Sequence, residues 1–298
     1  MRALLLSGGG SRGAFQVGAL KYLLEKEQDR PWYKVFYGSS IGAINAAFLS
    51  QFEDPYKATS NLLQLWGPLN DNSFRKHWLP LGVLHGLWKT SFYDTKPLKW
   101  LLDEHLHPEA IRDAGNKLRI GATSLRTGRY RLFTEQCANL RDAVLAASAF
   151  PVLFPPVQID NQLWVDGGFC NTNPLKTIIE VTGVSEIDII TALPLRSPYY
   201  RDDPRSTVSV AAQVFDTLID EILNKDIARA TKCNDDCSES QWKVGKRFVK
   251  LRIVKMDHSI PGHSVNFDNL DVRTMIDVGY RSAKHQLNLQ HRDTMRVR

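Results

Sequence analysis

The sequence predicts an α/β fold built on a largely parallel sheet. Short apolar runs of strand length are interspersed with longer segments of helical periodicity, an order that is typical of parallel strands connected by helices. The 298 residues would suffice for one large domain or two small ones. Because no linker or break in composition separates the halves, we expect a single domain over 1–298, with its motifs within about 1–195 and a motif-poor part at 196–298.

The expected elements alternate along the chain. Strand-like runs rich in apolar and β-branched residues lie at 3–7, 34–37, 118–125, 130–134, 163–165, 187–193 and 247–253. Helical periodicity occupies 13–25, 43–51, 56–66, 96–104, 141–148, 174–181, 210–231 and 269–289. The first two strands are followed by glycine-rich turns, which makes the edge where they end the first place to look for a site.

Composition narrows the class of protein. Hydrophobic residues make up 43% and charged residues 23%, as in an ordinary globular protein. No run reaches the roughly 18 to 20 apolar residues of a membrane-spanning helix, and the four apolar residues at 3–6 are too few for a signal-peptide core. We therefore expect a cytoplasmic protein with, at most, peripheral membrane contact. The net charge of +6 fits an anionic membrane surface, nucleic acid or neither. From the motifs below we expect no nucleic-acid partner.

The four cysteines do not form a metal motif. Cys137, Cys170, Cys233 and Cys237 lack the paired Cys/His spacing of a zinc site. We interpret all four as free thiols, with a Cys233–Cys237 disulfide as the alternative. We expect no metal and no cofactor.

The turn after the second strand reads GSSIG at 38–42, a G-x-S-x-G pattern. An apolar strand-like run leads into it and a helix-like run follows. This is the order of a nucleophile elbow, in which a serine on a strained strand-to-helix turn projects its hydroxyl. The flanking Gly38 and Gly42 let neighbouring backbone approach closely. The pattern makes Ser40 a candidate nucleophile, although a tight packed turn would look the same.

The turn after the first strand reads GGGSRG at 8–13 and fits G-x-G-x-x-G. A dinucleotide site would also need an acidic residue about 20 residues on, at the end of the second strand, where this chain has the serine motif instead. Since adjacent parallel strands end at one edge, the two glycine turns should meet there. Unpaired N–H groups at the start of the first helix, those of Gly9 and Gly10, would then face a developing oxyanion.

A serine nucleophile needs a proton acceptor. Of the eight histidines, His258 and His263 stand out because they flank Pro261-Gly262 in a loop. Asp166 is the other candidate, since it ends a short strand and is followed by Gly167 and Gly168. Taken alone, Asp-Gly-Gly is usually a hairpin turn.

The segment 74–92 is rich in aromatic and aliphatic residues interleaved with Arg75, Lys76 and Lys89, without a clean period. It fits either an irregular layer over the sheet or a hydrophobic cap at the entrance for an acyl chain.

Taken together, these motifs resemble the patatin-like phospholipase family. GGGSRG at 8–13 is similar to its oxyanion loop, GSSIG at 38–42 to its nucleophile elbow, and DGG at 166–168 to its aspartate motif. The passages at 147–156 and 171–174 are also similar, and the likeness covers about 1–193. Ile41 stands where many members have a smaller residue.

The resemblance implies a three-layer α/β/α sandwich and hydrolysis of acyl esters of lipids by a Ser–Asp dyad without histidine. Ser40 would be the nucleophile and Asp166 the base. The oxyanion hole would come from the loop Gly8, Gly9, Gly10, Ser11, Arg12 and Gly13, with Arg12 ordering it. The expected partner is a lipid substrate, met in transient contact with a membrane or micelle.

Three other hypotheses remain beside this one. A Ser-His-Asp triad would use His258 or His263 as its base. A non-enzymatic lipid- or protein-binding module would keep the fold without the reaction. A nucleotide-binding protein would use the glycine loop alone, and the absent ribose acid speaks against it.

Overall fold

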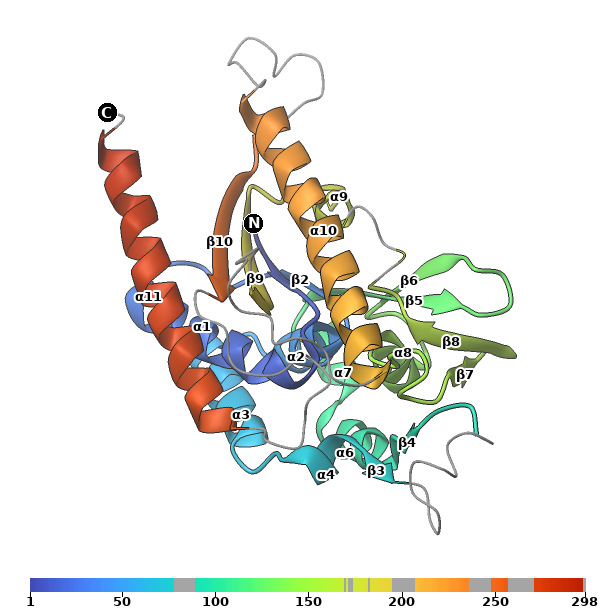
Figure 1. Ribbon diagram of the computed structural model, residues 1–298. Coiled ribbons are helices and arrows are strands. Elements are labelled where there is room, and N and C mark those ends of the chain that lie inside the picture. The colour runs from blue at the N-terminus through green and yellow to red at the C-terminus, as the bar shows by residue number, and fades with distance from the viewer. Residues whose placement is uncertain are drawn as a thin grey trace.

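A mixed sheet forms the centre of the protein, and helices cover both of its faces (Figure 1). The computed structural model describes residues 1–77, 89–168, 170, 174–181, 183–194, 207–235, 248–256 and 271–296. The strands of the central sheet are β1 (Arg2–Leu6), β2 (Val35–Gly38), β5 (Lys117–Ser124), β6 (Tyr130–Thr134), β7 (Val157–Ile159), β8 (Gln162–Asp166), β9 (Glu186–Pro194) and β10 (Lys250–Met256). A separate pair comprises β3 (Lys76–His77) and β4 (Tyr93–Asp94).

The helices fall between these strands. They are η1 (Gly10–Arg12), α1 (Gly13–Lys26), α2 (Ile41–Leu49), α3 (Pro55–Trp66), α4 (Asp71–Phe74), α6 (Lys96–His105), α7 (Pro108–Asp113), α8 (Leu140–Ala147), α9 (Pro174–Ile179), α10 (Thr207–Asp235) and α11 (Val272–Arg296). Every expected strand and helix overlaps one of these elements. The sequence patterns missed the short elements β3, β4, β7, α4 and α7, whose few residues are too short to show a period.

The strand order is β10-β9-β1-β2-β5-β8-β7, with β6 also paired to β5. The expected parallel pairing is confirmed from β10 to β5. Beyond this part the pairing is antiparallel: β5 pairs with β6 and with β8, and β8 forms a hairpin with β7. Its two-residue turn, Asp160-Asn161, has positive φ at both positions (49° and 58°), the backbone that a tight hairpin needs. The sheet is therefore mixed, and Asp166 enters the site from an antiparallel strand.

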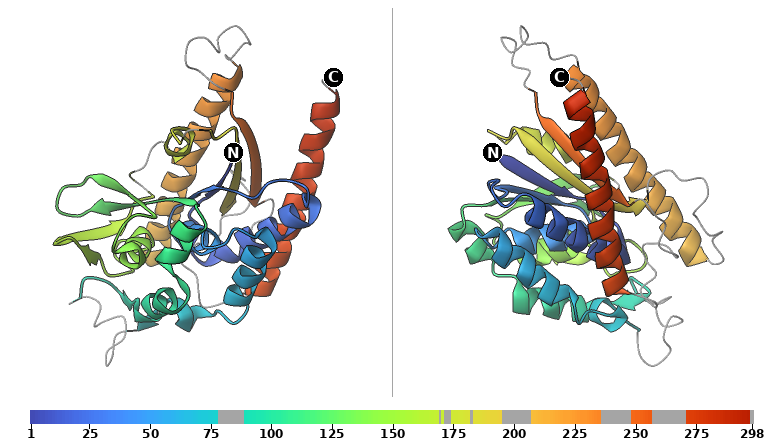
Figure 2. Two further views of the ribbon diagram at one scale, coloured as in Figure 1. Left: turned by 180° about the vertical axis from the view of Figure 1, so that it is seen from behind. Right: turned by 90° about the vertical axis from the view of Figure 1, so that its left-hand side faces the viewer.

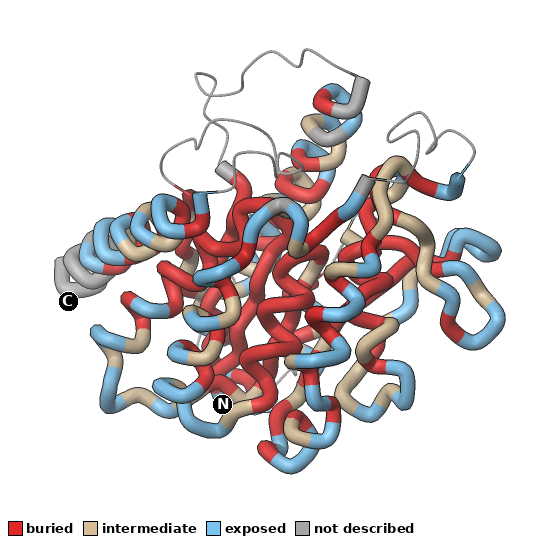
Figure 3. The backbone as a smooth tube through the Cα atoms, turned by 90° about the horizontal axis from the view of Figure 1, so that it is seen from below, coloured by how far each residue is buried: buried red, intermediate tan, exposed pale blue. Residues whose placement is uncertain are grey.

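Alternating side chains of the central strands face two helical layers, which confirms the α/β/α sandwich. Leu4 and Leu6 of β1 belong to the larger core cluster with α1 and α2, whereas Ala3 and Leu5 point to the opposite side, against α9 and α10. This is the period-two pattern of a strand buried on both faces. In Figure 1, α10 lies in front of the sheet, whereas α1 and α3 lie in front of it in the view from behind (Figure 2). Buried backbone runs through the middle of the fold (Figure 3).

A buried charge cluster fastens the end of the sheet away from the glycine turns. Asp188 of β9 accepts hydrogen bonds from Arg2 of β1 (2.7 Å) and from Arg252 of β10 (2.6 Å). Arg252 also pairs with Glu27, just after α1. Burial alone would raise the pKa of Asp188, but its bonds and charge interactions with Arg252 and Arg2 lower it. These ion pairs join β1, β9 and β10 at one end of the sheet. The glycine turns lie at the other end, where the parallel strands finish.

The expectation of one domain over 1–298 stays a prediction. Part of the segment 74–92 and the loop with His258 and His263 lie outside the described residues. Cys137, Cys170 and Cys233 are free thiols, as expected, and Cys237 is outside the described part.

Candidate active site

Ser40 occupies a strained turn between β2 and α2. Its backbone has φ 51° and ψ −128°, a region that residues with a side chain rarely adopt and that is often found at functional sites. The turn is held by the Ser40 carbonyl, which accepts hydrogen bonds from Ala43 N (2.8 Å) and from Ser148 Oγ (3.0 Å). The serine side chain is therefore fixed at the carboxyl end of β2.

The two motif glycines allow this turn to pack. A Cβ on Gly42 would lie 2.3 Å from the Leu6 carbonyl oxygen, and one on Gly38 would lie 2.2 Å from the Gly42 carbonyl oxygen. Both distances are far below any real contact, so only glycine fits at 38 and 42. The G-x-S-x-G pattern is thus explained by backbone of β1 and α2 lying against the elbow.

The sheet register brings Asp166 level with Ser40. Gly38 pairs with Ile120 of β5, and Ala122, two residues further along β5, pairs with Asp166 of β8. Ser40 is likewise two residues beyond Gly38. Since β6 pairs with the same stretch of β5 from its other side, β2 and β8 share one side of β5. The ends of β2 and β8 therefore meet there and bring the serine and the aspartate together, although the two are far apart in the chain.

Asp166 is completely buried and only partly satisfied. Its Oδ1 accepts a hydrogen bond from Gly168 N (2.8 Å), while Oδ2 accepts none of ordinary geometry from the described residues. Burial raises the pKa of Asp166 to about 7, even though the Gly168 N–H and the nearby Ser40 hydroxyl both lower it. The hydroxyl thus acts on the carboxylate without closing a regular hydrogen bond, as is common for catalytic pairs without substrate.

The glycines after the aspartate fit it against the elbow. A Cβ on Gly167 would lie 2.6 Å from the Gly121 carbonyl oxygen. A Cβ on Gly168 would lie 2.8 Å from Ser39 Oγ. The D-G-G turn therefore packs directly against the serine turn.

The first glycine loop, 8–13, surrounds the serine from the side of β1. A Cβ on Gly8 would lie 3.2 Å from Ser40 Cβ, so this glycine packs against the serine itself. Gly9 and Gly10 line the same pocket as Ser40. Their N–H groups donate no hydrogen bond to any described residue. These two N–H groups are therefore available to a ligand.

The remaining loop residues support its shape rather than line the pocket. Ser11 and Arg12 are buried, and a Cβ on Gly13 would lie 2.5 Å from Ile41 Cγ1. The Arg12 guanidinium lies 3.6 Å from the Asp216 carboxylate of α10, with both side chains nearly buried. This ion pair links the loop to α10, and the ordering role expected of Arg12 stays a prediction.

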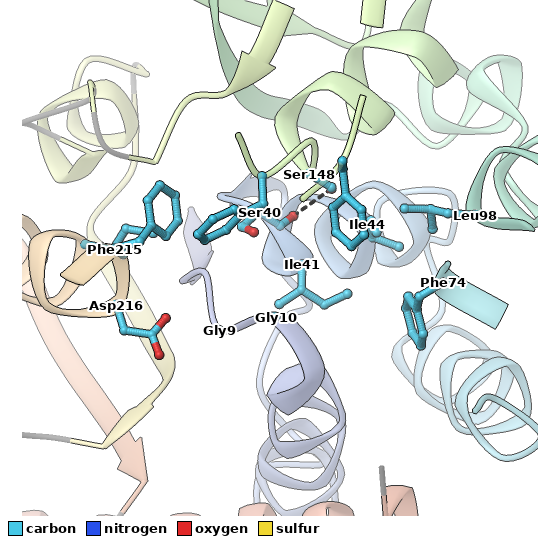
Figure 4. A pocket seen from close by; sticks show the side chains of 13 residues that line it. Gly9, Gly10, Ser40, Ile41, Ile44, Phe74, Leu98, Ser148, Phe215 and Asp216 are labelled. Atoms are coloured by element: carbon cyan, nitrogen blue, oxygen red, sulfur yellow. Dashed lines mark hydrogen bonds between the residues drawn. The ribbon is translucent and has the colours of Figure 1, made fainter. Parts of the chain in front are cut away.

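An apolar pocket of about 520 Å³, open to solvent, leads to Ser40. Its polar lining side chains are those of Ser40, Ser148 and Asp216. The apolar ones come from five regions of the chain and are Ile41, Ile44, Phe74, Leu98, Phe150, Phe154, Phe215 and Ile219. Figure 4 shows Phe215 and Asp216 on one side of the serine and Phe74 and Leu98 on the other. Such a lining suits a hydrocarbon chain whose polar end reaches the serine.

Sequence reasoning missed most of this lining. Phe74, the first residue of the hydrophobic segment 74–92, lines the pocket and also packs on Trp66 in the core. Both interpretations of that segment, a covering layer and a cap at an acyl entrance, stay predictions. Phe150 and Phe154 belong to the Phe/Pro-rich passage before β7. Phe215 of α10 packs on Phe150 with ring centroids 4.2 Å apart. Nothing in the sequence of α10 distinguishes this inward face from an ordinary core face.

The passage at 147–156 connects the two site residues. Ser148 binds the Ser40 carbonyl, and the neighbouring Ala149 carbonyl accepts a hydrogen bond from Asp166 N (2.9 Å).

No histidine is among the described residues that line the pocket. In the part of the chain that the structure describes, no group of three or more His, Cys, Asp or Glu side chains could hold a metal ion. No described helix is long and apolar enough to cross a bilayer.

Comparison with known proteins assigns the family. The sequence model described as patatin-like phospholipase matches residues 4–179, more than half of the chain. The chain belongs to the patatin-like phospholipase family. The match contains the glycine loop, the serine turn and the aspartate turn, so all three motifs lie inside the family's region.

Relatives in this family are distant and differ in length. A cGAMP-activated phospholipase of Pseudomonas aeruginosa is 29% identical over 183 residues, covering 57% of this chain and 53% of the relative. The calcium-independent phospholipase A2-gamma of Homo sapiens is 24% identical over 251 residues, covering 75% of this chain and 31% of the relative. The chain thus spans about half or less of the length of these relatives. The crystal structure of VipD from Legionella pneumophila covers 96% of this chain and 66% of its own, with 13% identity and a TM-score of 0.48.

Proposed function

We propose that this protein hydrolyses carboxylic esters of phospholipids, lysophospholipids or related acyl lipids, with Ser40 as nucleophile and Asp166 as base. One observation carries the proposal: a completely buried carboxylate with an unsatisfied Oδ2 lies beside a serine held on a strained turn, at an apolar pocket. A packed structural turn would need neither the strain nor the unsatisfied oxygen, both of which cost stability. Membership of the patatin-like family supports lipid hydrolysis in general.

The reaction would run in two halves. Ser40 Oγ attacks the ester carbonyl carbon while its proton passes to Asp166, and the oxyanion is bound by the N–H groups of Gly9 and Gly10. The C–O bond to the alcohol then breaks, Asp166 returns the proton to the leaving oxygen, and an acyl-Ser40 ester remains. A water molecule then attacks this ester while its proton passes to Asp166. The bond between Ser40 Oγ and the acyl carbon breaks, Asp166 returns the proton to Oγ, and the fatty acid is released with the serine restored.

The raised pKa of Asp166 suits the base. A carboxylate with an ordinary pKa near 4 binds a serine proton poorly, whereas a base with a pKa near the working pH is both available and strong enough. Burial supplies this shift. The complete burial of Asp166 also keeps bulk water from its carboxyl group.

Labelling with a fluorophosphonate probe, followed by peptide mass spectrometry, tests this function. We expect the probe on the peptide that contains Ser40. We also expect Ser40→Ala to reduce release of fatty acid from a short-chain ester to background, with an unchanged circular dichroism spectrum. Full activity in Ser40→Ala would remove Ser40 from the mechanism. Absence of both labelling and hydrolysis would favour a binding module on the same fold.

We further propose that α10 places the pocket at a lipid surface. Val210, Val214 and Leu218 follow one another at intervals of four residues and are 46%, 55% and 50% exposed. From 207 to 218 the one charged residue is Asp216, which is buried. The outer face of this part of α10 is therefore uncharged and largely apolar, with Thr217 its exposed polar residue. Phe215 and Asp216 line the pocket from the same helix (Figure 4). Such a face suits the boundary between lipid headgroups and acyl chains.

Leu218→Asp is expected to lower hydrolysis of anionic phospholipid vesicles about tenfold or more, because a charge would enter the lipid boundary. Hydrolysis of a soluble short-chain ester should stay the same. Ala228→Asp, also exposed on α10 but among charged neighbours, is the matched control and should leave both rates unchanged. Equal rates on vesicles for wild type and Leu218→Asp would exclude this contact surface.

A further inference from the structure

A second cavity lies beside the serine turn and has no part in the mechanism above. Its volume is about 300 Å³, part of which is open to solvent, and it is lined by Leu5, Tyr37, Pro174, Ile222 and Leu223, among others. Ser39 and Gly8 also face it, so its wall includes the residue before the nucleophile and the first glycine of the loop. Its larger side chains are aliphatic apart from Tyr37, and they suit hydrocarbon, while Ser7 and Ser39 add hydroxyl groups.

Ile219 separates this cavity from the catalytic pocket. It is the one described residue that lines both spaces. Its Cδ1 lies 3.4 Å from the position of a Cβ on Gly8 and 3.1 Å from that of a Cβ on Gly168. The side chain is 6% exposed, and it therefore fills the gap between the two glycine turns.

The gap is close to the reacting groups. The same Gly8 position lies 3.2 Å from Ser40 Cβ, and the same Gly168 position lies 3.2 Å from Asp166 Oδ1. A route through Ile219 would thus branch off next to the scissile ester, not at the far end of an acyl chain. In a diacyl glycerolipid the second chain also branches off next to the scissile ester, on the adjacent glycerol carbon. The second cavity is placed where that chain would go.

We propose that Ile219 closes this second acyl site and makes the enzyme selective for esters with a single chain, such as lysophospholipids, over diacyl lipids. The inference rests on the proposed ester hydrolysis at Ser40. With Ile219 in place, one chain fills the catalytic pocket and a second finds no apolar space near the serine. Shortening the side chain joins the two spaces and admits both chains.

The test compares 1-hexanoyl-lysophosphatidylcholine with dihexanoylphosphatidylcholine, both below their critical micelle concentrations. Monomeric lipids have no aggregate in which the second chain could remain, so the protein must accommodate it. We expect wild type to have the higher kcat/KM on the single-chain lipid. Ile219→Ala should raise the diacyl to single-chain ratio of kcat/KM about tenfold or more, the size of effect that a change of a few methylenes in an apolar site produces. The increase in kcat/KM should come mainly from a lower KM for the diacyl lipid.

Leu223→Ala is the matched control. Leu223 is buried on the same helix, one turn further on, and lines the second cavity but not the catalytic pocket. This variant loses a comparable side chain while Ile219 still closes the gap, so its substrate ratio should equal that of wild type. Ile219→Val is a smaller truncation and should shift the ratio in the same direction by less. It keeps the test usable if Ile219→Ala does not fold.

Two results would overturn the inference. One is a wild type that hydrolyses the diacyl lipid as well as the single-chain lipid. The other is a folded Ile219→Ala or Ile219→Val with an unchanged ratio. If no variant hydrolyses either lipid, the proposed function fails on its own. The inference is then tested by binding. Each of the two lipids displaces a fluorescent fatty acid from Ser40→Ala and from Ser40→Ala/Ile219→Ala. The ratio of diacyl to single-chain affinity must then be higher in the double variant.

Discussion

Asp166→Asn is expected to abolish most ester hydrolysis and to make the protein more stable at neutral pH. The amide cannot take the Ser40 proton, and loss of a positioned base typically costs about 10²–10⁴ in rate. The gain in stability comes from the same burial that raises the pKa of Asp166 to about 7. Ionising this carboxyl is harder in the folded protein than in the unfolded chain, so its charge works against folding.

The difference in stability between Asp166→Asn and wild type should depend on pH. In the unfolded chain the carboxyl has the ordinary aspartate pKa of 3.8, and burial raises its pKa in the folded protein to about 7. Below pH 3.8 it is protonated in both states and costs nothing. As the pH rises from 3.8 to 7, the unfolded state loses its proton first and the wild type loses stability, by about 4 kcal/mol at most for three pKa units. The amide of the Asp166→Asn variant does not titrate, so the variant's advantage should grow over this range and stay constant above it.

Urea unfolding from pH 4 to pH 8 measures this difference. A gap in the free energy of unfolding that widens with pH, in favour of Asp166→Asn, is the expected outcome. Glu53→Gln, at an exposed site remote from the pocket, should show no such gap. An Asp166→Asn variant that is less stable than wild type at pH 8 would mean that the carboxylate is structurally favourable and not held ready as a base.

Gly9→Ala is expected to lower kcat about 10²–10³-fold, the usual effect of losing an oxyanion donor. The added Cβ would lie 2.6 Å from Ala192 Cβ of β9, a distance that forces the loop to move. The N–H groups of Gly9 and Gly10 would then point away from the oxyanion, while KM should change less because the apolar pocket is intact. Steady-state kinetics on a soluble ester measure both parameters.

The contact with Ala192 offers a rescue experiment. Ala192→Gly alone removes the opposing methyl group and should leave activity unchanged. Combined with Gly9→Ala, it relieves the 2.6 Å clash and should restore at least part of the lost kcat. A double variant as inactive as Gly9→Ala, with the fold preserved, would show that loop displacement by β9 is not the cause of the loss.

Much of the fold and of the candidate site could be predicted from local sequence. The glycine turns were visible because close backbone packing tolerates only glycine, as at 38 and 42, and such positions leave a signature in a single sequence. The neighbouring positions of the first two turns followed from the rule that parallel strands end at one edge.

The rest depended on tertiary pairing. The antiparallel entry of β8 was hidden, because a short strand reads the same in either direction, and only its pairing with β5 sets Asp166 level with Ser40. Phe215, Asp216 and Ile219 come from a helix about 50 residues beyond the aspartate, and an inward apolar face looks alike whether it meets a core or a pocket. The pKa of Asp166 likewise arises from burial, which no local motif encodes.

The rate at which a fluorophosphonate labels Ser40, measured from pH 5 to pH 9 in wild type and in Asp166→Asn, tests the dyad most directly. In wild type we predict a rate that increases tenfold per pH unit below about 7 and levels off above it, because only the ionised Asp166 can take the serine proton. In Asp166→Asn the rate should be lower throughout and the inflection near pH 7 should be gone. An inflection that persists in Asp166→Asn would contradict the dyad and assign the proton to another group. His258 and His263, the alternative bases, would then be the first residues to substitute.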